Sequence, residues 1–130
     1  MADYSISRPT PANDSYADDA SVPGEFHKLA DELGCEQVAV TLIRVPPHSD
    51  FEQGTGHHHD QLEEVYVIGR GTLTMRFDDE IEEVGAGSVV RVAPQTTRSH
   101  RNLGDEPVEI WAISRRIAES DATKVDGFWD

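Results

Sequence analysis

From residue 64 onward, the sequence consists of short apolar segments separated by turn signals about every ten residues. The segments are EVYVI (64–68), TLTMRF (72–77), EIEEV (80–84), SVVRV (88–92), residues 97–103 and VEIWAIS (108–114). Gly, Asp and Pro punctuate them, and their alternating pattern is typical of an antiparallel sandwich or barrel. Strands do not alternate with helices, which argues against a doubly wound parallel sheet. The sequence therefore predicts an all-β domain.

The N-terminal third has three parts of different character. Residues 1–24 are rich in Ser, Pro, Ala and Asp without any period, which predicts a flexible or surface-hugging arm. Apolar residues at helical spacing, followed by Gly34, predict a short helix over 25–33. The period then changes to two in QVAVTLIRV (37–45), which predicts a strand that ends at two prolines.

The length of 130 residues fits one domain, which we place at 25–116 between the arm and a tail at 117–130. Phe128 and Trp129 predict that this tail docks on the barrel or on a partner subunit.

The charge and the single cysteine limit the environment and the partners. The formal net charge of −14 argues against nucleic acid and anionic membrane surfaces as partners. Cys35 is the one cysteine, so no intrachain disulfide can form, and a reducing compartment is the simplest context. The sequence has neither an apolar run of membrane-spanning length nor a basic-then-apolar leader. We expect a soluble cytoplasmic protein.

Three consecutive histidines carry the strongest chemical signal. On an extended backbone, His57 and His59 face one way and His58 the other, so two imidazoles lie about 7 Å apart on one face. Glu64 follows five residues later and could reach the same ion from an adjacent strand. Two His and one carboxylate with open positions suit non-haem Fe, and also Zn, Mn or Ni. The alternative is a solvated loop that binds no metal.

The stretch GHHHDQLEEVYVIGRG resembles the first motif of the cupin superfamily. That motif has His-x-His, a gap of three or four residues, Glu, six residues and Gly, which His57, His59, Glu64 and Gly71 satisfy. A Gly usually stands six positions before the first His, where this chain has Phe51.

A second cupin motif is present in altered form in AGSVVRVAPQTTRSHRN. Gly87 and Asn102 match it, whereas Ala93 and Gln95 replace its Pro and Gly, and Arg98 stands where the third metal-ligating His normally stands. The resemblance covers residues 38–114, and this part of the chain is similar to small single-domain, cupin-2-like proteins. It implies a double-stranded β-helix (jelly-roll) barrel, a site in the barrel mouth, a small-molecule ligand and a homodimer.

Arg98 leaves the chemistry of the site open. An inward-facing guanidinium could pair with Glu64 in a metal-free barrel, or bind a carboxylate of an anionic ligand. His100 shares a face with Arg98, so a small register shift would let it complete a set of three His and one Glu. Tyr66 could supply a hydroxyl to the pocket.

Two functions follow as hypotheses. The first is a metal-dependent protein that acts on a small organic molecule, for which the cupin resemblance implies dioxygenase, decarboxylase or isomerase chemistry. The second is a metal-free module that binds or senses a small anion through Arg98 without catalysis. His48, Asp50 and Glu52 precede the histidines at alternating spacing and could line the barrel mouth, but we favour a solvated loop.

Overall fold

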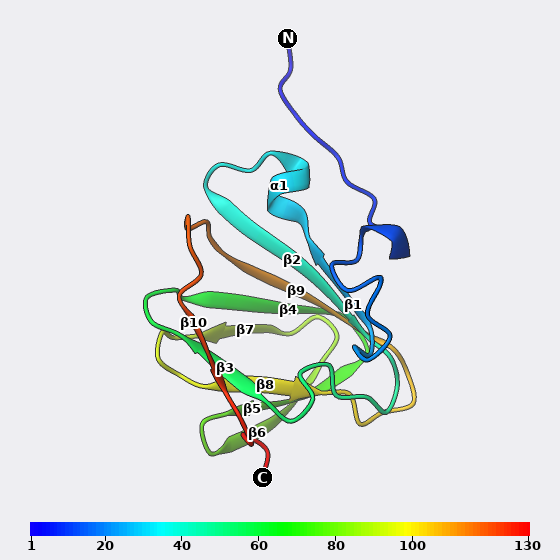
Figure 1. Ribbon diagram of the computed structural model, residues 1–130, viewed down its shortest axis with the longest axis vertical. Helices are drawn as coiled ribbons and strands as arrows, with labels where there is room; N and C mark the ends of the chain where they lie inside the picture. Colours follow the sequence, from blue (N-terminus) through cyan, green and yellow to red (C-terminus); the bar gives the residue numbers. More distant parts are fainter.

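The computed structural model describes all 130 residues and shows two five-stranded antiparallel sheets facing each other (Figure 1). The strand orders are β1-β2-β9-β4-β7 and β10-β3-β8-β5-β6. The strands are β1 (Glu25–Lys28), β2 (Val38–Val45), β3 (Gly56–His59), β4 (Glu64–Arg70), β5 (Thr72–Phe77), β6 (Glu80–Gly85), β7 (Val89–Val92), β8 (Arg98–Arg101), β9 (Val108–Arg115) and β10 (Ala122–Val125). The helical segments are η1 (Pro11–Asn13) and α1 (Leu29–Leu33). The all-β jelly-roll barrel predicted from the sequence is confirmed.

The core lies between the two sheets and follows the period of two in the sequence. Tyr66 and Ile68 point inward from β4, and Leu73 and Met75 point inward from β5, each at most 3% exposed. The residues between them on each strand are more exposed. Burying one large apolar side chain contributes about 1.5–3 kcal/mol, so this alternation fixes which face of each strand turns inward.

The predicted helix over 25–33 is wrong in its first half. Residues Glu25–Lys28 form the edge strand β1, in which Phe26 pairs with Ile43 of β2, and only Leu29–Leu33 are helical. Phe26 and His27 face opposite sides; Phe26 is half-buried and His27 is fully buried, so the backbone gains hydrogen bonds to β2 while both side chains keep packing contacts. A helix of nine residues is marginal on its own, which explains the outcome. Neither helical segment has the length and apolar character needed to cross a membrane.

The C-terminal tail docks on the barrel, as the sequence predicted. Its strand β10 pairs with β3, so that Ala122 lies opposite His59 and Lys124 opposite His57. Beyond it, the Trp129 indole N–H donates a hydrogen bond to Ser99 Oγ at 3.0 Å. The tail therefore covers the outer edge of the strand that carries the histidines (Figure 1).

Candidate metal centre

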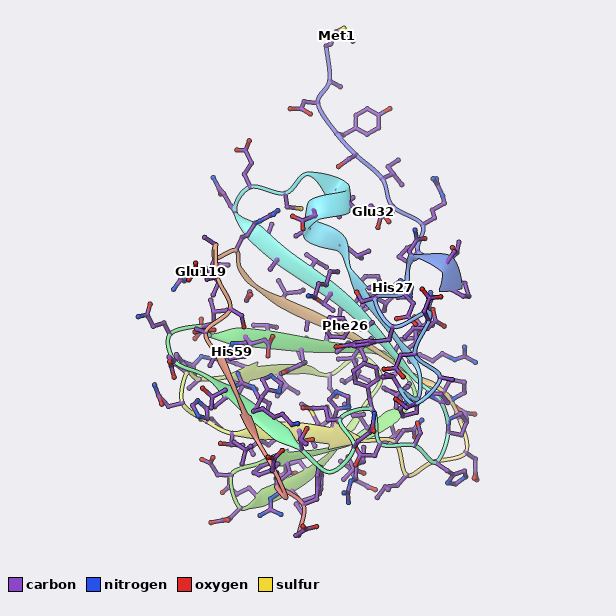
Figure 2. All side chains as sticks on the ribbon, in the orientation of Figure 1. Met1, Phe26, His27, Glu32, His59 and Glu119 are labelled. Atoms are coloured by element: carbon purple, nitrogen blue, oxygen red, sulfur yellow. The ribbon has the colours of Figure 1, made fainter.

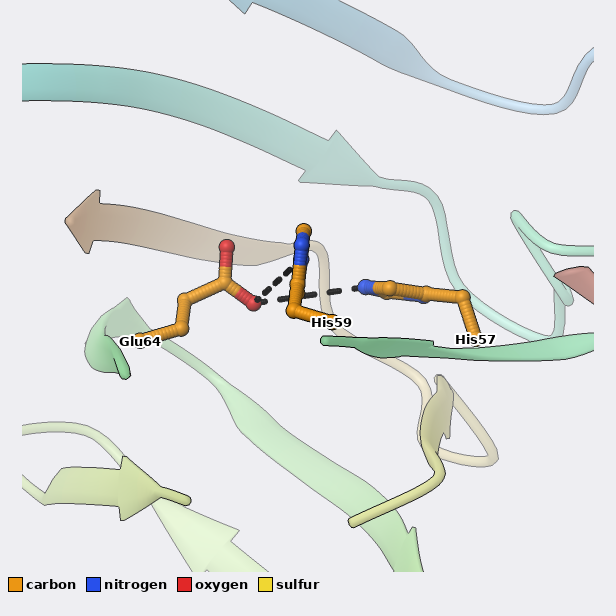
Figure 3. A group of neighbouring side chains, drawn as sticks. All are labelled: His57, His59 and Glu64. Atoms are coloured by element: carbon orange, nitrogen blue, oxygen red, sulfur yellow. Dashed lines mark ion pairs between the residues drawn. The ribbon is translucent and has the colours of Figure 1, made fainter. Parts of the chain in front are cut away.

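Strand β3 and the start of β4 bring His57, His59 and Glu64 together (Figure 3). The Nε2 atoms of His57 and His59 lie 4.0 Å and 3.7 Å from the same oxygen, Glu64 Oε1. One ligand atom from each of the three side chains lies within 4.8 Å of the others. The imidazole planes are nearly perpendicular, with ring centroids 5.2 Å apart. The cluster predicted from the sequence thus forms a compact group of two imidazoles and one carboxylate.

Each imidazole is bonded to a carboxylate through its other nitrogen. His57 Nδ1 is 3.1 Å from Glu52 Oε2, and His59 Nδ1 is 2.7 Å from Asp121 Oδ1. A carboxylate can only accept, so these contacts place a proton on Nδ1 and, in the neutral ring, leave the lone pair of Nε2 directed at the cluster. Metal-binding histidines in proteins are oriented in this way by carboxylates or carbonyls.

The sequence offered Glu52 only as the less favoured alternative of barrel-mouth lining, and it did not identify Asp121. The interpretation of Glu52 as part of a solvated loop is wrong, because its side chain is only 14% exposed and contacts His57. The loop interpretation does hold for His48, whose exposed side chain pairs with Asp105. Asp121 is 62 residues from its partner His59, and no local pattern connects the two.

Asp121 is held ionised by the groups around it. Burial alone would raise the pKa of its carboxyl, but hydrogen bonds from the backbone N–H of Gln61, from His59 and from the backbone N–H of Leu62 together lower the pKa to about 2. The carboxylate therefore ties the C-terminal tail to the strand that precedes β4.

We expect Asp121→Asn to destabilise the fold in a pH-dependent way. The pKa is lower in the folded chain than the usual 3.8, so the stabilisation is present above about pH 4 and is lost as the pH falls through 2. The shift corresponds to about 1–2 kcal/mol after allowance for solvent screening. Urea unfolding of both proteins between pH 7 and pH 2.5 should show that the difference between their free energies of unfolding becomes smaller toward low pH. A difference that stays constant over this range would contradict the expectation.

Glu64 is held by two further groups inside the barrel. The Tyr66 hydroxyl donates a hydrogen bond to Glu64 Oε1, and Arg98 Nε lies 3.7 Å from the same oxygen. Burial raises the pKa of Tyr66 well above its usual value, and the charge of Glu64 raises it further, so the phenol stays neutral and remains a donor. Tyr66 also lines the cavity beside the cluster, and its role in binding a ligand stays a prediction.

Arg98 points into the barrel from β8 and is only 1% exposed. Its Nη1 donates to the Thr96 carbonyl at 2.8 Å, whereas Nε and Nη2 have no hydrogen-bond partner. The side chain does not line the cavity. The geometry therefore brings Arg98 to Glu64, and its predicted contact with an anionic ligand stays a prediction.

His100, two residues further along β8, lies outside the group of three. Its Nε2 is 3.6 Å from Glu52 Oε1, and its ring stacks on Phe51 with centroids 6.3 Å apart. Burial lowers the pKa of His100, although the charge of Glu52 opposes the change, so the ring is neutral at pH 7. Its role as a further metal ligand stays a prediction.

The remaining motif residues have structural roles. Gly71 adopts φ +78°, and a Cβ there would lie 2.5 Å from the Pro107 carbonyl oxygen, so only glycine fits this turn. Asn102 is completely buried, and its Nδ2 donates to the carbonyls of Val45, Pro46 and Glu106. Gly71 thus shapes the turn after β4, and Asn102 holds together the chain that follows β2 and the chain that precedes β9.

Comparison with known proteins agrees with this geometry. The Cupin domain family model matches residues 41–114, which is more than half of the chain. The chain belongs to the cupin superfamily. An uncharacterized protein of Methanocaldococcus jannaschii is 34% identical over 58 residues, which are 45% of this cupin and 46% of that protein.

Two solved structures show the same fold. A cupin protein from Bacteroides fragilis superposes with a TM-score of 0.64 at 24% identity, over 92% of this chain and 89% of that one. A sugar phosphate isomerase of the cupin superfamily from Silicibacter pomeroyi gives a TM-score of 0.63 at 21% identity, over 72% of this chain and 60% of that one. The matches thus span less than two thirds of both the isomerase and the Methanocaldococcus protein.

Proposed function

We propose that this cupin binds a divalent transition metal through His57, His59 and Glu64 and acts on a small organic molecule at the open positions of that metal. One observation carries the proposal: the Nδ1 atoms of His57 and His59 are both hydrogen-bonded to carboxylates. These hydrogen bonds orient the rings so that both Nε2 atoms face one oxygen of Glu64. Fe, Mn, Zn or Ni suits this donor set. The metal, when bound, would supply a Lewis acid or a centre that binds oxygen.

The charges around the cluster also support a divalent ion. Glu52, Glu64 and Asp121 carry three negative charges, and Arg98 carries the one positive charge that faces Glu64. With neutral imidazoles the group has a formal charge of minus two, which a divalent ion balances. The residues present therefore fit a divalent metal in donor type and in charge.

Around this centre, the chain's own residues prepare the site for a ligand. The Tyr66 phenol stays protonated and can donate to an oxygen near Glu64, and the neutral His100 ring forms part of the cavity wall. Dioxygenase, decarboxylase and isomerase chemistry all remain candidates. The likeness to a sugar phosphate isomerase concerns the fold and does not choose among them. The homodimer implied by the cupin resemblance stays a prediction that sedimentation can check.

A second candidate is a metal-free cupin that binds a small anion without turnover. The observation that favours it is Arg98, a buried guanidinium whose Nε and Nη2 lack hydrogen-bond partners. A carboxylate that entered the barrel could satisfy both atoms.

Metal content measured by mass spectrometry separates the two functions. We expect about one metal ion per chain in protein purified without chelators, and a loss of at least 90% in the His57→Ala, His59→Ala double variant. The matched control is His58→Ala, because His58 lies between them on β3 and faces the other way. Parent protein that stays metal-free after incubation with Fe, Mn, Zn and Ni salts would overturn the proposal in favour of the anion-binding module.

A further inference from the structure

A cavity of about 640 Å³ adjoins the metal cluster and has a polar part and an apolar part. Phe26 on β1 and His59 on β3 come from opposite sheets and both line it (Figure 2). The polar lining consists of the cluster residues His57, His59 and Glu64 with Glu52, Tyr66 and His100, and also of Lys28, Thr41, Gln53 and Ser120. The main apolar lining is Tyr16, Val22, Phe26, Ile43, Phe51 and Ala112. A ligand that fills this cavity must therefore have two chemically different ends.

Aromatic rings dominate the apolar part. Phe26 and Phe51 are stacked with centroids 5.9 Å apart and planes within 13°. Tyr16 meets both rings edge-on at 5.9 Å and 6.1 Å. Phe51 in turn stacks on His100, which contacts Glu52, the partner of His57. The rings thus form one contiguous group, which is linked to the metal cluster through His100 and Glu52.

The N-terminal segment is fixed in place where it contributes Tyr16 to this wall. Asp14 Oδ1 accepts hydrogen bonds from the backbone N–H groups of Tyr16 at 3.1 Å and Phe26 at 2.8 Å. The Ser15 N–H donates to the Phe26 carbonyl at 2.8 Å. Tyr16 is therefore a built part of the cavity, although 42% of its surface remains exposed.

We infer that the ligand is a small aromatic carboxylate, with its ring against Phe26, Phe51 and Tyr16 and its carboxylate toward the metal cluster. This inference rests on the proposed function and names its substrate class. Offset and edge-to-face contacts with three aromatic rings favour a flat aromatic ring over a saturated ring of the same size.

The charge of the lining agrees with a monoanion. Lys28 is the only lysine or arginine on the cavity wall, where Glu52 and Glu64 are the carboxylates. With a divalent ion bound, the lining carries a net formal charge of plus one, which one carboxylate balances. A sugar phosphate would instead bring two charges and several hydroxyls against Phe26 and Phe51, which offer no hydrogen-bond partners.

The test uses calorimetric titration of the full-length, metal-loaded protein with four probes: benzoate, cyclohexanecarboxylate, acetate and fructose 6-phosphate. We expect benzoate to bind at least fivefold more tightly than each of the other three. Tyr16→Leu should weaken benzoate binding about threefold to tenfold, with little change for cyclohexanecarboxylate. Tyr4→Leu is its matched control, since Tyr4 is exposed and lies outside the cavity.

A second pair of variants tests whether the effect of Tyr16→Leu comes from the lost ring or from a displaced N-terminal segment. Phe51→Leu should also reduce the preference for benzoate over cyclohexanecarboxylate, whereas Phe77→Leu, at an aromatic residue that packs on the core outside the cavity, should not. Equal binding of benzoate and cyclohexanecarboxylate, or tighter binding of fructose 6-phosphate, would overturn the ring-specific inference while leaving the metal proposal intact. Parent protein that takes up no metal would instead refute the proposed function, and the inference with it.

Discussion

Removal of residues 118–130 should weaken metal binding at least tenfold and lower the free energy of unfolding by about 2–4 kcal/mol. The deletion takes away β10, the strand that pairs with β3 along its whole length from Gly56 to His59. On its other side, β3 pairs with β8 in register only at His57 and Arg98. The deletion also removes Asp121, which orients His59 through a hydrogen bond of 2.7 Å. The histidines would lose both their backbone support and one orienting carboxylate.

Two variants separate the contributions of strand pairing and carboxylate. Asp121→Asn keeps β10 and should weaken metal binding about tenfold or more with a smaller loss of stability. Removal of residues 2–10, at the exposed N-terminal end, is the deletion control and should leave metal affinity unchanged. Metal affinity and urea unfolding would be measured on all three proteins. Undiminished affinity after loss of residues 118–130 would show that β3 holds the site without the tail.

The sequence predicts those parts of the site that lie close together along the chain. His57 and His59 are two residues apart on one strand, and Glu64 follows after a single turn, so strand period and motif spacing are enough to bring them together. The barrel is predictable for the same reason, because strands such as β4, β5 and β9 alternate inward-facing apolar residues with more exposed ones and turn signals separate them. Met75, for example, is completely buried at an inward position of β5.

The parts that were missed depend on contacts across the fold. Asp121 reaches His59 only because a tail with no strand signal pairs with β3. Glu52 precedes the motif in an acidic loop whose composition resembles a solvated one, and the barrel wall alone decides that it turns inward. In β1, apolar residues at helical spacing misled the prediction, since edge pairing with β2 outweighs a weak local preference.

Replacement of Arg98 by Met should tighten metal binding by about fivefold or more. Arg98 places a fixed positive charge 3.7 Å from the oxygen of Glu64 toward which both Nε2 atoms point. At an effective dielectric constant of about 20, a like charge this close opposes a divalent ion by several kcal/mol, and screening leaves about 1–3 kcal/mol. Met keeps most of the side-chain volume without leaving a polar group in the barrel. Arg98→His should have a larger effect, since it removes the charge and adds an imidazole near His57, its partner in the β3–β8 pairing.

Arg91→Met is the matched control, because it also removes one positive charge. Arg91 forms an exposed ion pair with Glu63, and solvent screens its charge from a buried ion. Competition with a chromophoric chelator at pH 7.5 would give the metal affinity of all four proteins, and circular dichroism would show whether the variants remain folded. Weaker metal binding in folded Arg98→Met would show that the guanidinium supports the ion rather than opposing it. Tight binding that appears only in Arg98→His, from a parent that binds no metal, would assign the native barrel to the anion-binding function. Replacement of Arg98 therefore distinguishes the two proposed functions. In the first, the barrel binds a metal and Arg98 lowers its affinity; in the second, the barrel binds no metal and Arg98 occupies the position of the missing ligand.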